Sequence, residues 1–313
     1  MFKILLNRPD GSIGIMDEDE QQFVQTAVDA YLQGETVYFK EYIHKKQWEY
    51  FYEGTKGRVG KIKVYSPLPV DWPVGADMQI EIWHDLNYKF ASEFNRLKKS
   101  FPVQHHRQSK SFDHEFVMLY GSWQHERETV MQTLERLHIL DRSIYSRPPQ
   151  IAEYKKHINC DYLFPITSEA EPRTIEQTHS TISHEQRFCH ESNIFNLFDA
   201  SKTAHCWVVM DCYCLNNDMT GTVTEKVLYP ILYGVPFIYI GNHEQRLTLS
   251  RWGIRPNDLA RADVRSVAEQ MLWLQSIFRD PELAQQWQDR QGETIISNLR
   301  ALENLPAVLK KGL

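Results

Sequence analysis

In the N-terminal third of the chain, short apolar runs alternate with polar turns. Runs that are rich in β-branched and aromatic residues and bounded by glycine or proline are typical of β-strands. We predict strands at residues 2–6, 37–43, 60–66 and 78–85. The acidic cluster at residues 17–20 suits a helix N-terminus electrostatically. Apolar residues then recur at intervals of three and four, which indicates one face of a helix. They are Phe23, Ala27, Ala30 and Tyr31.

Strand-like and helix-like segments continue to alternate in the rest of the chain. The predicted strands are residues 114–121, 161–166, 205–215 and 235–240, and the predicted helices are 123–142, 192–204, 266–278 and 281–305. This alternation predicts an α/β fold with a parallel sheet covered on both faces, in which ligands bind beyond the carboxyl ends of the strands. The basic, proline-broken segment 98–111 is interpreted as a linker. We therefore expect an N-terminal domain of residues 1–108 and a C-terminal domain of residues 109–313 with a helical tail.

The segment from Thr222 to Asn242 carries the most specific pattern. Thr222 and Glu225 have the spacing of a capping box, which by itself explains Glu225 structurally. Lys226 is harder to explain, because a cation in the first helical turn opposes the helix dipole. Either a bound anion offsets this repulsion, or the lysine points into solvent.

Two residues of the same segment predict where its helix is interrupted and where it ends. Pro230 lies inside the apparent helix, so we expect a kink there. Gly234 suits the position just after a helix end, and residues 235–240 suit a buried strand that begins with a proline.

Composition narrows the classes of function. The 313 residues are enough for two domains, and 42% hydrophobic and 24% charged residues are typical of a globular protein. A formal net charge of −6 argues against broad nucleic-acid binding, although a local basic patch stays open. The aromatic content of 12% suits either a carbohydrate or base pocket or a tyrosine-rich core.

Cysteine use and hydropathy bear on the compartment. The five cysteines are an odd number, and the first residues resemble a strand more than a signal peptide, so we expect a cytoplasmic protein. No apolar run reaches the roughly 18 residues of a membrane span, so any membrane contact, for instance at an inner membrane, would be peripheral. Cys212 and Cys214 lack a second pair at zinc spacing, and residues 17–19 match a D-x-D motif only formally. We expect no metal and no permanently bound cofactor.

Thr224-Glu225-Lys226, a short helix, and then Gly234 and Pro236 before a strand together resemble glycosyltransferases of the fucosyltransferase type (glycosyltransferase family 10) and related bacterial and phage sugar transferases. The resemblance implies a GT-B arrangement, in which two Rossmann-like domains face a cleft. It also implies that the Thr224-Glu225-Lys226 segment contacts the nucleotide of the donor. In the strand before this motif the family usually shows a glutamate, where this chain has Asp211.

A second anion site is expected where the strand ending at Gly121-Ser122 leads into a helix, because amide groups line such turns. Related transferases often carry an arginine at this point that binds the diphosphate, and Arg127 is the match, with His125 nearby. The alternative is an ordinary strand-turn-helix with a solvated Arg127. Arg187 is a further possible phosphate clamp, on position alone.

A sugar transferase that inverts the anomeric centre needs a base for the acceptor hydroxyl. Asp85 and His84 follow a predicted strand in the N-terminal domain and are the candidates, with Asp211 a further catalytic candidate from the resemblance. The alternative is that they are strand-end polar residues, with Asp85 as an N-cap. Weaker candidates for the base or the acceptor contacts are Glu81, His105, His106, Gly11 and Gly14.

The sequence therefore leads us to expect a glycosyltransferase that moves a sugar from a nucleoside diphosphate sugar to an acceptor hydroxyl. Lys226 and Arg127, rather than a metal, would stabilise the phosphate charge. The acceptor could be a surface polysaccharide, a lipid-linked glycan, a protein or, in a phage-type enzyme, DNA. The alternatives are a non-catalytic nucleotide- or carbohydrate-binding protein and another nucleotide-dependent enzyme such as a kinase. The lack of a P-loop motif counts against a kinase.

Overall fold

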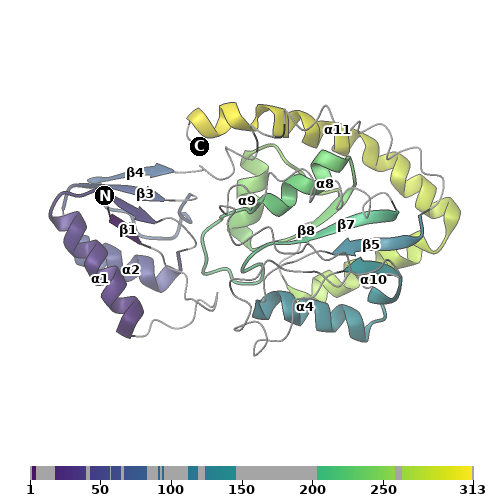
Figure 1. The fold of residues 1–313 in the computed structure, drawn as a ribbon, viewed down its shortest axis with the longest axis horizontal. Helices are drawn as coiled ribbons and strands as arrows, with labels where there is room; N and C mark the ends of the chain where they lie inside the picture. Colours follow the sequence, from purple (N-terminus) through teal and green to yellow (C-terminus); the bar gives the residue numbers. More distant parts are fainter. Residues whose placement is uncertain are drawn as a thin grey trace, which may run out of the picture.

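The described part of the chain folds around two four-stranded parallel sheets (Figure 1). The structure is a computed structural model that describes residues 2–4, 18–39, 43–56, 58–64, 67–82, 91, 94, 112–118, 124–145, 203–257 and 263–311. Its parallel sheets and intervening helices confirm the expected α/β class. No helix in these ranges is both long enough and apolar enough to cross a membrane.

The first sheet winds in one direction. Its strands are β1 (Phe2–Ile4), β2 (Val37–Phe39), β3 (Gly60–Val64) and β4 (Met78–Ile82). They lie side by side in chain order and are parallel. Right-handed crossovers that all step the same way place their helices on one face of a sheet. Accordingly, α1 (Glu18–Leu32) and α2 (Lys45–Thr55) lie together on one side of this sheet (Figure 1).

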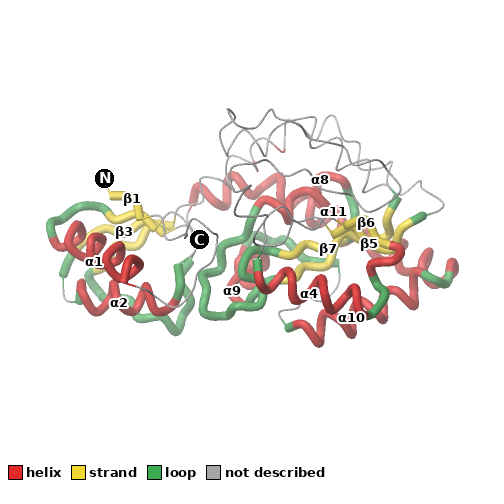
Figure 2. Tube along the Cα trace, turned by 60° about the horizontal axis from the view of Figure 1, so that its bottom comes forward, coloured by secondary structure: helices red, strands yellow, loops and turns green. Residues whose placement is uncertain are grey.

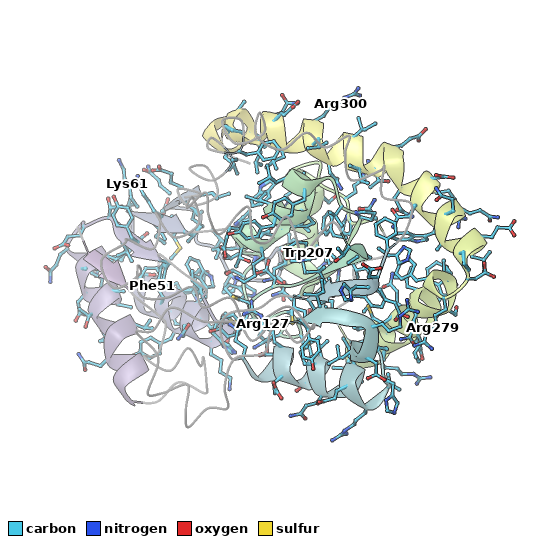
Figure 3. The ribbon with its side chains drawn as sticks, turned by 45° about the vertical axis from the view of Figure 1, so that its right-hand side comes forward. Phe51, Lys61, Arg127, Trp207, Arg279 and Arg300 are labelled. Atoms are coloured by element: carbon cyan, nitrogen blue, oxygen red, sulfur yellow. The ribbon has the colours of Figure 1, made fainter. Side chains whose placement is uncertain are left out.

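Aromatic side chains fill the space between the first sheet and these helices. Trp48 and Phe51 of α2 meet Phe39 of β2 edge-on, with ring centroids 5.9 and 5.1 Å apart respectively. Figure 3 shows Phe51 inside this layer. On β3 the buried Ile62 and Val64 alternate with lysines, and on β4 partly buried apolar residues alternate with exposed polar ones. Lys63 of β3 pairs with Glu81 of β4 at 3.0 Å.

The second sheet reverses its direction of winding. Its strands are β5 (His114–Met118), β6 (Ser143–Tyr145), β7 (Ala204–Met210) and β8 (Phe237–Ile240). Their spatial order is β6-β5-β7-β8, so the chain steps one way from β5 to β6 and the other way from β7 to β8. The change of direction falls between β5 and β7, which makes the carboxyl ends of these two strands a topological switch point.

Helices cover both faces of the second sheet, as the sequence predicts. They are α4 (His125–Arg136), α8 (Leu228–Tyr233), α9 (His243–Arg251), α10 (Val264–Phe278) and α11 (Pro281–Lys311), with short 3-10 helices η3 (Leu140–Arg142) and η4 (Glu225–Val227). Successive residues of β7 belong to opposite cores: Trp207 packs with α8 and the last turns of α11, and Val208 packs with α4 and α10. Figures 1 and 2 show α4 and α10 on the face opposite α8.

The strands of the first sheet end at Ile82 and those of the second begin at His114, but the core of the second sheet includes residues that precede His114. Ala91 and Phe94, which precede the predicted boundary at residue 108, are fully buried in the core of the second sheet. In addition, residues 43–45 at the start of α2 pair with residues 218–220 through backbone hydrogen bonds. A GT-B arrangement with a cleft between the domains stays a prediction.

Candidate functional site

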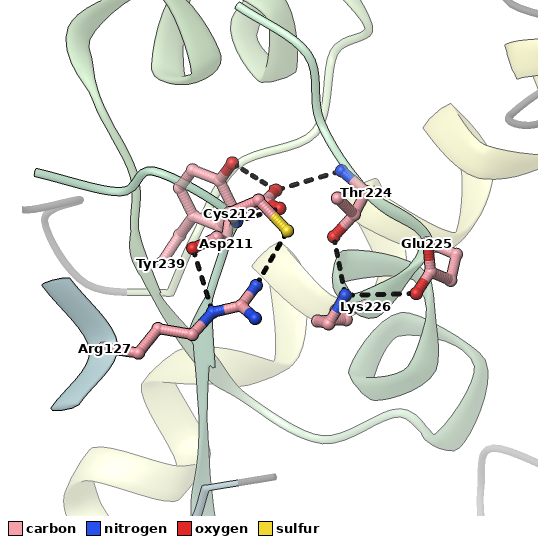
Figure 4. Close-up of polar contacts among 7 residues, drawn as sticks. All are labelled: Arg127, Asp211, Cys212, Thr224, Glu225, Lys226 and Tyr239. Atoms are coloured by element: carbon pink, nitrogen blue, oxygen red, sulfur yellow. Dashed lines mark hydrogen bonds and ion pairs between the residues drawn. The ribbon is translucent and has the colours of Figure 1, made fainter. Parts of the chain in front are cut away.

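A cluster of charged side chains lies at the switch point of the second sheet (Figure 4). All seven residues of β7 are buried, and the strand ends at Met210 rather than continuing to residue 215 as predicted. Asp211 follows directly, and Arg127 reaches it from the first turn of α4. Because ligands bind at such points in parallel sheets, this edge is the candidate functional site.

Asp211 is fully buried, and both of its carboxylate oxygens accept hydrogen bonds. The amide of Cys212 donates to Oδ1 at 2.8 Å. The amide of Thr224 and the hydroxyl of Tyr239 donate to Oδ2 at 3.0 and 2.8 Å. Burial, and then the nearby Asp211 carboxylate, raise the pKa of Tyr239 well above its usual value, so its hydroxyl stays a donor. The Asp211 carboxylate is therefore enclosed by its donors, and it ties Cys212, Thr224 and Tyr239 together.

Arg127 is also fully buried rather than solvated. Its Nε donates to the carbonyl oxygen of Asp211 at 3.2 Å, and its Nη2 donates to the Cys212 sulfur at 3.0 Å. Figure 3 places Arg127 inside the molecule, whereas Arg279 lies at the surface. The guanidinium therefore holds the turn after β7 in place and adds positive charge beneath the site.

The helix after the site begins later than the sequence pattern predicts. Thr224, not Thr222, is the N-cap of η4, and its side chain makes no capping hydrogen bond. The prediction of Thr222 as the N-cap is therefore wrong. The physical reason is that the Asp211 carboxylate holds the Thr224 amide, which keeps this residue extended at φ −90° and ψ 166°.

The expected irregularity at Pro230 is present as a junction between two helices. η4 ends at Val227 and α8 begins at Leu228, so Pro230 falls in the first turn of α8, where its missing N–H costs no helical hydrogen bond. Gly234 follows α8 in the left-handed conformation at φ 68°, as predicted for a helix end.

Lys226 supplies a positive charge from a side chain that is only partly buried. Its Nζ lies 3.2 Å from Glu225 Oε1 and 3.5 Å from Thr224 Oγ1. The Lys226 side chain is 21% exposed, whereas that of Glu225 is 6% exposed. Burial by itself lowers the pKa of Lys226, but the neighbouring carboxylates of Glu225 and Asp211 raise it, and the pKa lies above its usual value. Lys226 is thus a charged cation at the edge of the sheet.

The structure brings together Arg127, Asp211, Thr224, Glu225 and Lys226 of the predicted site residues. Five predicted site residues lie outside the described part of the chain: His84, Asp85, Gly121, Ser122 and Arg187. The weaker candidates Gly11, Gly14, His105 and His106, and the side chain of His125, lie outside it too. Glu81 is in β4, where its side chain is 65% exposed and pairs with Lys63.

Sequence reasoning missed two residues that organise the site. Tyr239 lies within an apolar run. The only sequence signal of its role is that the hydroxyl of a buried tyrosine needs a hydrogen-bond partner. Gln245 forms a capping box with Asn242 at the start of α9 and donates to the carbonyl oxygens of Cys212 and Thr222. The Asn-x-x-Gln spacing is a capping signature that could have identified this helix and its glutamine.

Metal-binding chemistry has no candidate within the described ranges, where no three His, Cys, Asp or Glu side chains gather closely enough to hold an ion. In the same ranges the cysteines, Cys206, Cys212 and Cys214, are buried. Burial raises the pKa of Cys214 to about 12.

Two comparisons with known proteins complete the description of the site. No model of a known protein family matches this chain, and no curated protein matches it. The resemblance to fucosyltransferase-type enzymes therefore remains one of motif residues at this sheet edge.

Proposed function

We propose that the protein is a glycosyltransferase that binds a nucleoside diphosphate sugar at the carboxyl edge of the second sheet and transfers the sugar to an acceptor hydroxyl. The observation that carries the proposal is Lys226: a charged side chain, 21% exposed, whose ammonium group is held beside the buried carboxylate of Glu225, next to the switch point of a parallel sheet. This combination suits a ligand that presents phosphate oxygens and sugar hydroxyls together.

Each of the four charged residues at this edge has its own role in the proposed reaction. Lys226 neutralises the charge that develops on the departing diphosphate, which lowers the energy of the transition state without a metal. Glu225 accepts hydrogen bonds from ribose hydroxyls. Arg127 and Asp211 are buried and bonded to the turn after β7, so they position this edge rather than contact the sugar donor.

An inverting transfer also needs a base for the acceptor hydroxyl. Because Asp211 is enclosed by donors, we assign this role to Asp85 or His84 in the N-terminal domain. The same enclosure favours one alternative, a protein that binds a nucleotide sugar without turning it over. A phage-type transferase that modifies DNA differs from the leading proposal only in its acceptor.

A thermal-shift screen with ADP, CDP, GDP, UDP and dTDP tests the proposal. A diphosphate at a hundred times its Kd stabilises the folded state by about 2.7 kcal/mol. We expect one base to be preferred and Lys226→Ala to weaken its binding about tenfold or more, because hydrogen bonds to charged groups contribute about 1.5–3 kcal/mol.

Lys63→Ala is the matched control. Lys63 also pairs with a glutamate, at 3.0 Å, but it lies in the first sheet, so its loss leaves nucleotide affinity unchanged. If no diphosphate stabilises the protein, the proposal is wrong. Binding without release of sugar from any nucleotide sugar would support the non-catalytic alternative. Donor hydrolysis that requires a divalent metal, abolished by EDTA, would contradict the metal-free chemistry.

A further inference from the structure

The residues between β7 and η4 form a loop whose two ends are tied together. We call residues 212–223 the arm. Gln245 donates from the same side-chain nitrogen to the carbonyl oxygens of Cys212, at 2.8 Å, and of Thr222, at 3.0 Å. The side-chain amide of Gln245 therefore holds the two ends of the arm together.

Gln245 is itself held rigidly. It is fully buried in the first turn of α9, and its Oε1 accepts a hydrogen bond from the Asn242 amide at 2.9 Å. The returning part of the arm packs tightly on this turn: a Cβ atom added to Gly221 would lie 2.6 Å from the carbonyl oxygen of Glu244. The amide of Gln245 thus has one arrangement that satisfies its hydrogen bonds.

The tip of the arm contacts the first sheet's layer of helices. The amide of Lys45, at the start of α2, donates to the carbonyl oxygen of Asp218 at 2.9 Å. The amide of Thr220 donates to the carbonyl oxygen of Ile43 at 3.3 Å. The arm therefore spans from the start of α2 to the sheet edge that carries the candidate site.

We propose that Gln245 is a positioning residue for this site: by tying both ends of the arm together, it fixes Thr224 and, through Thr224, the ammonium group of Lys226. The last part of this proposal, that Lys226 contacts a phosphate of the sugar donor, rests on the proposed glycosyl transfer. The earlier steps concern the arm alone and are tested without a nucleotide.

The structure offers a matched control in Gln47. Both glutamines are fully buried and occupy the third position of a capping box, where the side-chain oxygen accepts from the N-cap amide. Gln47 Nε2, however, has no hydrogen-bond partner among the described residues, whereas Gln245 Nε2 has two. Gln47→Met removes the capping interaction alone, and Gln245→Met removes the capping interaction together with the arm tie.

Hydrogen–deuterium exchange on the full chain, followed by mass spectrometry of peptides that cover residues 212–224, measures the arm directly. We expect Gln245→Met to speed exchange in these peptides about tenfold or more, because it removes two buried hydrogen bonds. We expect Gln47→Met to change exchange at most at residues 218–220, which pair with the start of α2, and both variants to leave the β5 and β7 peptides protected. Gln245→Asn, whose shorter side chain withdraws the amide from both carbonyls, provides the same test if the methionine variant does not fold.

Three results would overturn the proposal: unchanged exchange in the arm, an equal increase across the whole second sheet, or failure of both Gln245 variants to fold. Each would reduce Gln245 to a general structural residue. The diphosphate found by the thermal-shift screen gives a second readout, for which Gln245→Met should raise the Kd several-fold and Gln47→Met should not. If no diphosphate binds, the proposed function fails while the exchange result still decides the role of Gln245 in holding the arm.

Discussion

Replacing Tyr239 with phenylalanine tests whether the Asp211 carboxylate organises the site. The substitution keeps the buried ring and removes one hydroxyl, which donates to Asp211 at 2.8 Å. A hydrogen bond to a charged group contributes about 1.5–3 kcal/mol. Asp211 keeps its two amide donors, so the variant does not leave an uncompensated buried charge. We therefore expect Tyr239→Phe to destabilise the protein by about 1.5–3 kcal/mol.

At about 2–4 °C per kcal/mol for a domain of about 200 residues, this loss lowers the melting temperature by about 3–12 °C. Urea unfolding followed by circular dichroism gives the free energy independently. Tyr31→Phe is the matched control, since its hydroxyl makes one long bond, 3.4 Å, to the neutral carbonyl of Arg58. It should cost about 1 kcal/mol or less. Equal losses in the two variants, or no loss in Tyr239→Phe, would refute the assignment of Asp211 as the organising group.

Two further substitutions test other parts of the fold. Burial lowers the pKa of His44, the N-cap of α2, so protonation favours the unfolded chain and the protein loses stability as the pH falls below about 6.5. In urea titrations at pH 7.5 and 5, His44→Asn should lose less stability than the unmodified protein, and an identical pH dependence would contradict this. Gly221→Ala forces a Cβ to within 2.6 Å of the Glu244 carbonyl oxygen and should cost about 1–3 kcal/mol by calorimetry. Gly75→Ala, whose Cβ would make an ordinary contact, should stay within about 0.5 kcal/mol, and equal costs would disprove the close packing of the arm.

Seven of the eight strands in the described residues could be predicted because their sequences are distinctive over a few residues, whereas the three-residue β6 (Ser143–Tyr145) was not predicted. β7 is an apolar run in which every residue is buried, and β3 alternates between polar and apolar side chains. Helix α2 was not predicted, since its aromatic residues favour strands and it contains Gly54. A Cβ on Gly54 would lie 2.8 Å from the Val28 side chain, so the glycine permits the close approach of α1 and α2. Because the need for glycine at this position is set by contact with α1, the sequence of α2 alone does not reveal it.

The same limit explains what was predicted at the site and what was not. The Glu225-Lys226 pair was identified because a lysine at a helix start is locally unfavourable. The start of the helix was misplaced, because the partner that decides it, Asp211, lies 13 residues earlier in the chain. Arg127 was named as a candidate from its place in the sequence, but its burial depends on a contact with a residue 84 positions away. Local pattern finds the charged residues, and long-range contacts decide which of them stay accessible.

The balance of charge at this edge has a consequence for ligand binding. Arg127 and Lys226 supply two positive charges, and Asp211 and Glu225 supply two negative ones, so these four side chains are together neutral. A diphosphate gains little from a neutral cluster unless Lys226 exchanges its Glu225 partner for phosphate oxygens. That exchange is local, since Glu225 Oε1 lies only 3.2 Å from the ammonium group, and it would release the carboxylate to accept hydrogen bonds from hydroxyls. Under the proposed function, the Lys226–Glu225 ion pair thus keeps the lysine charged and oriented, and its opening couples phosphate binding to recognition of the sugar hydroxyls beside it.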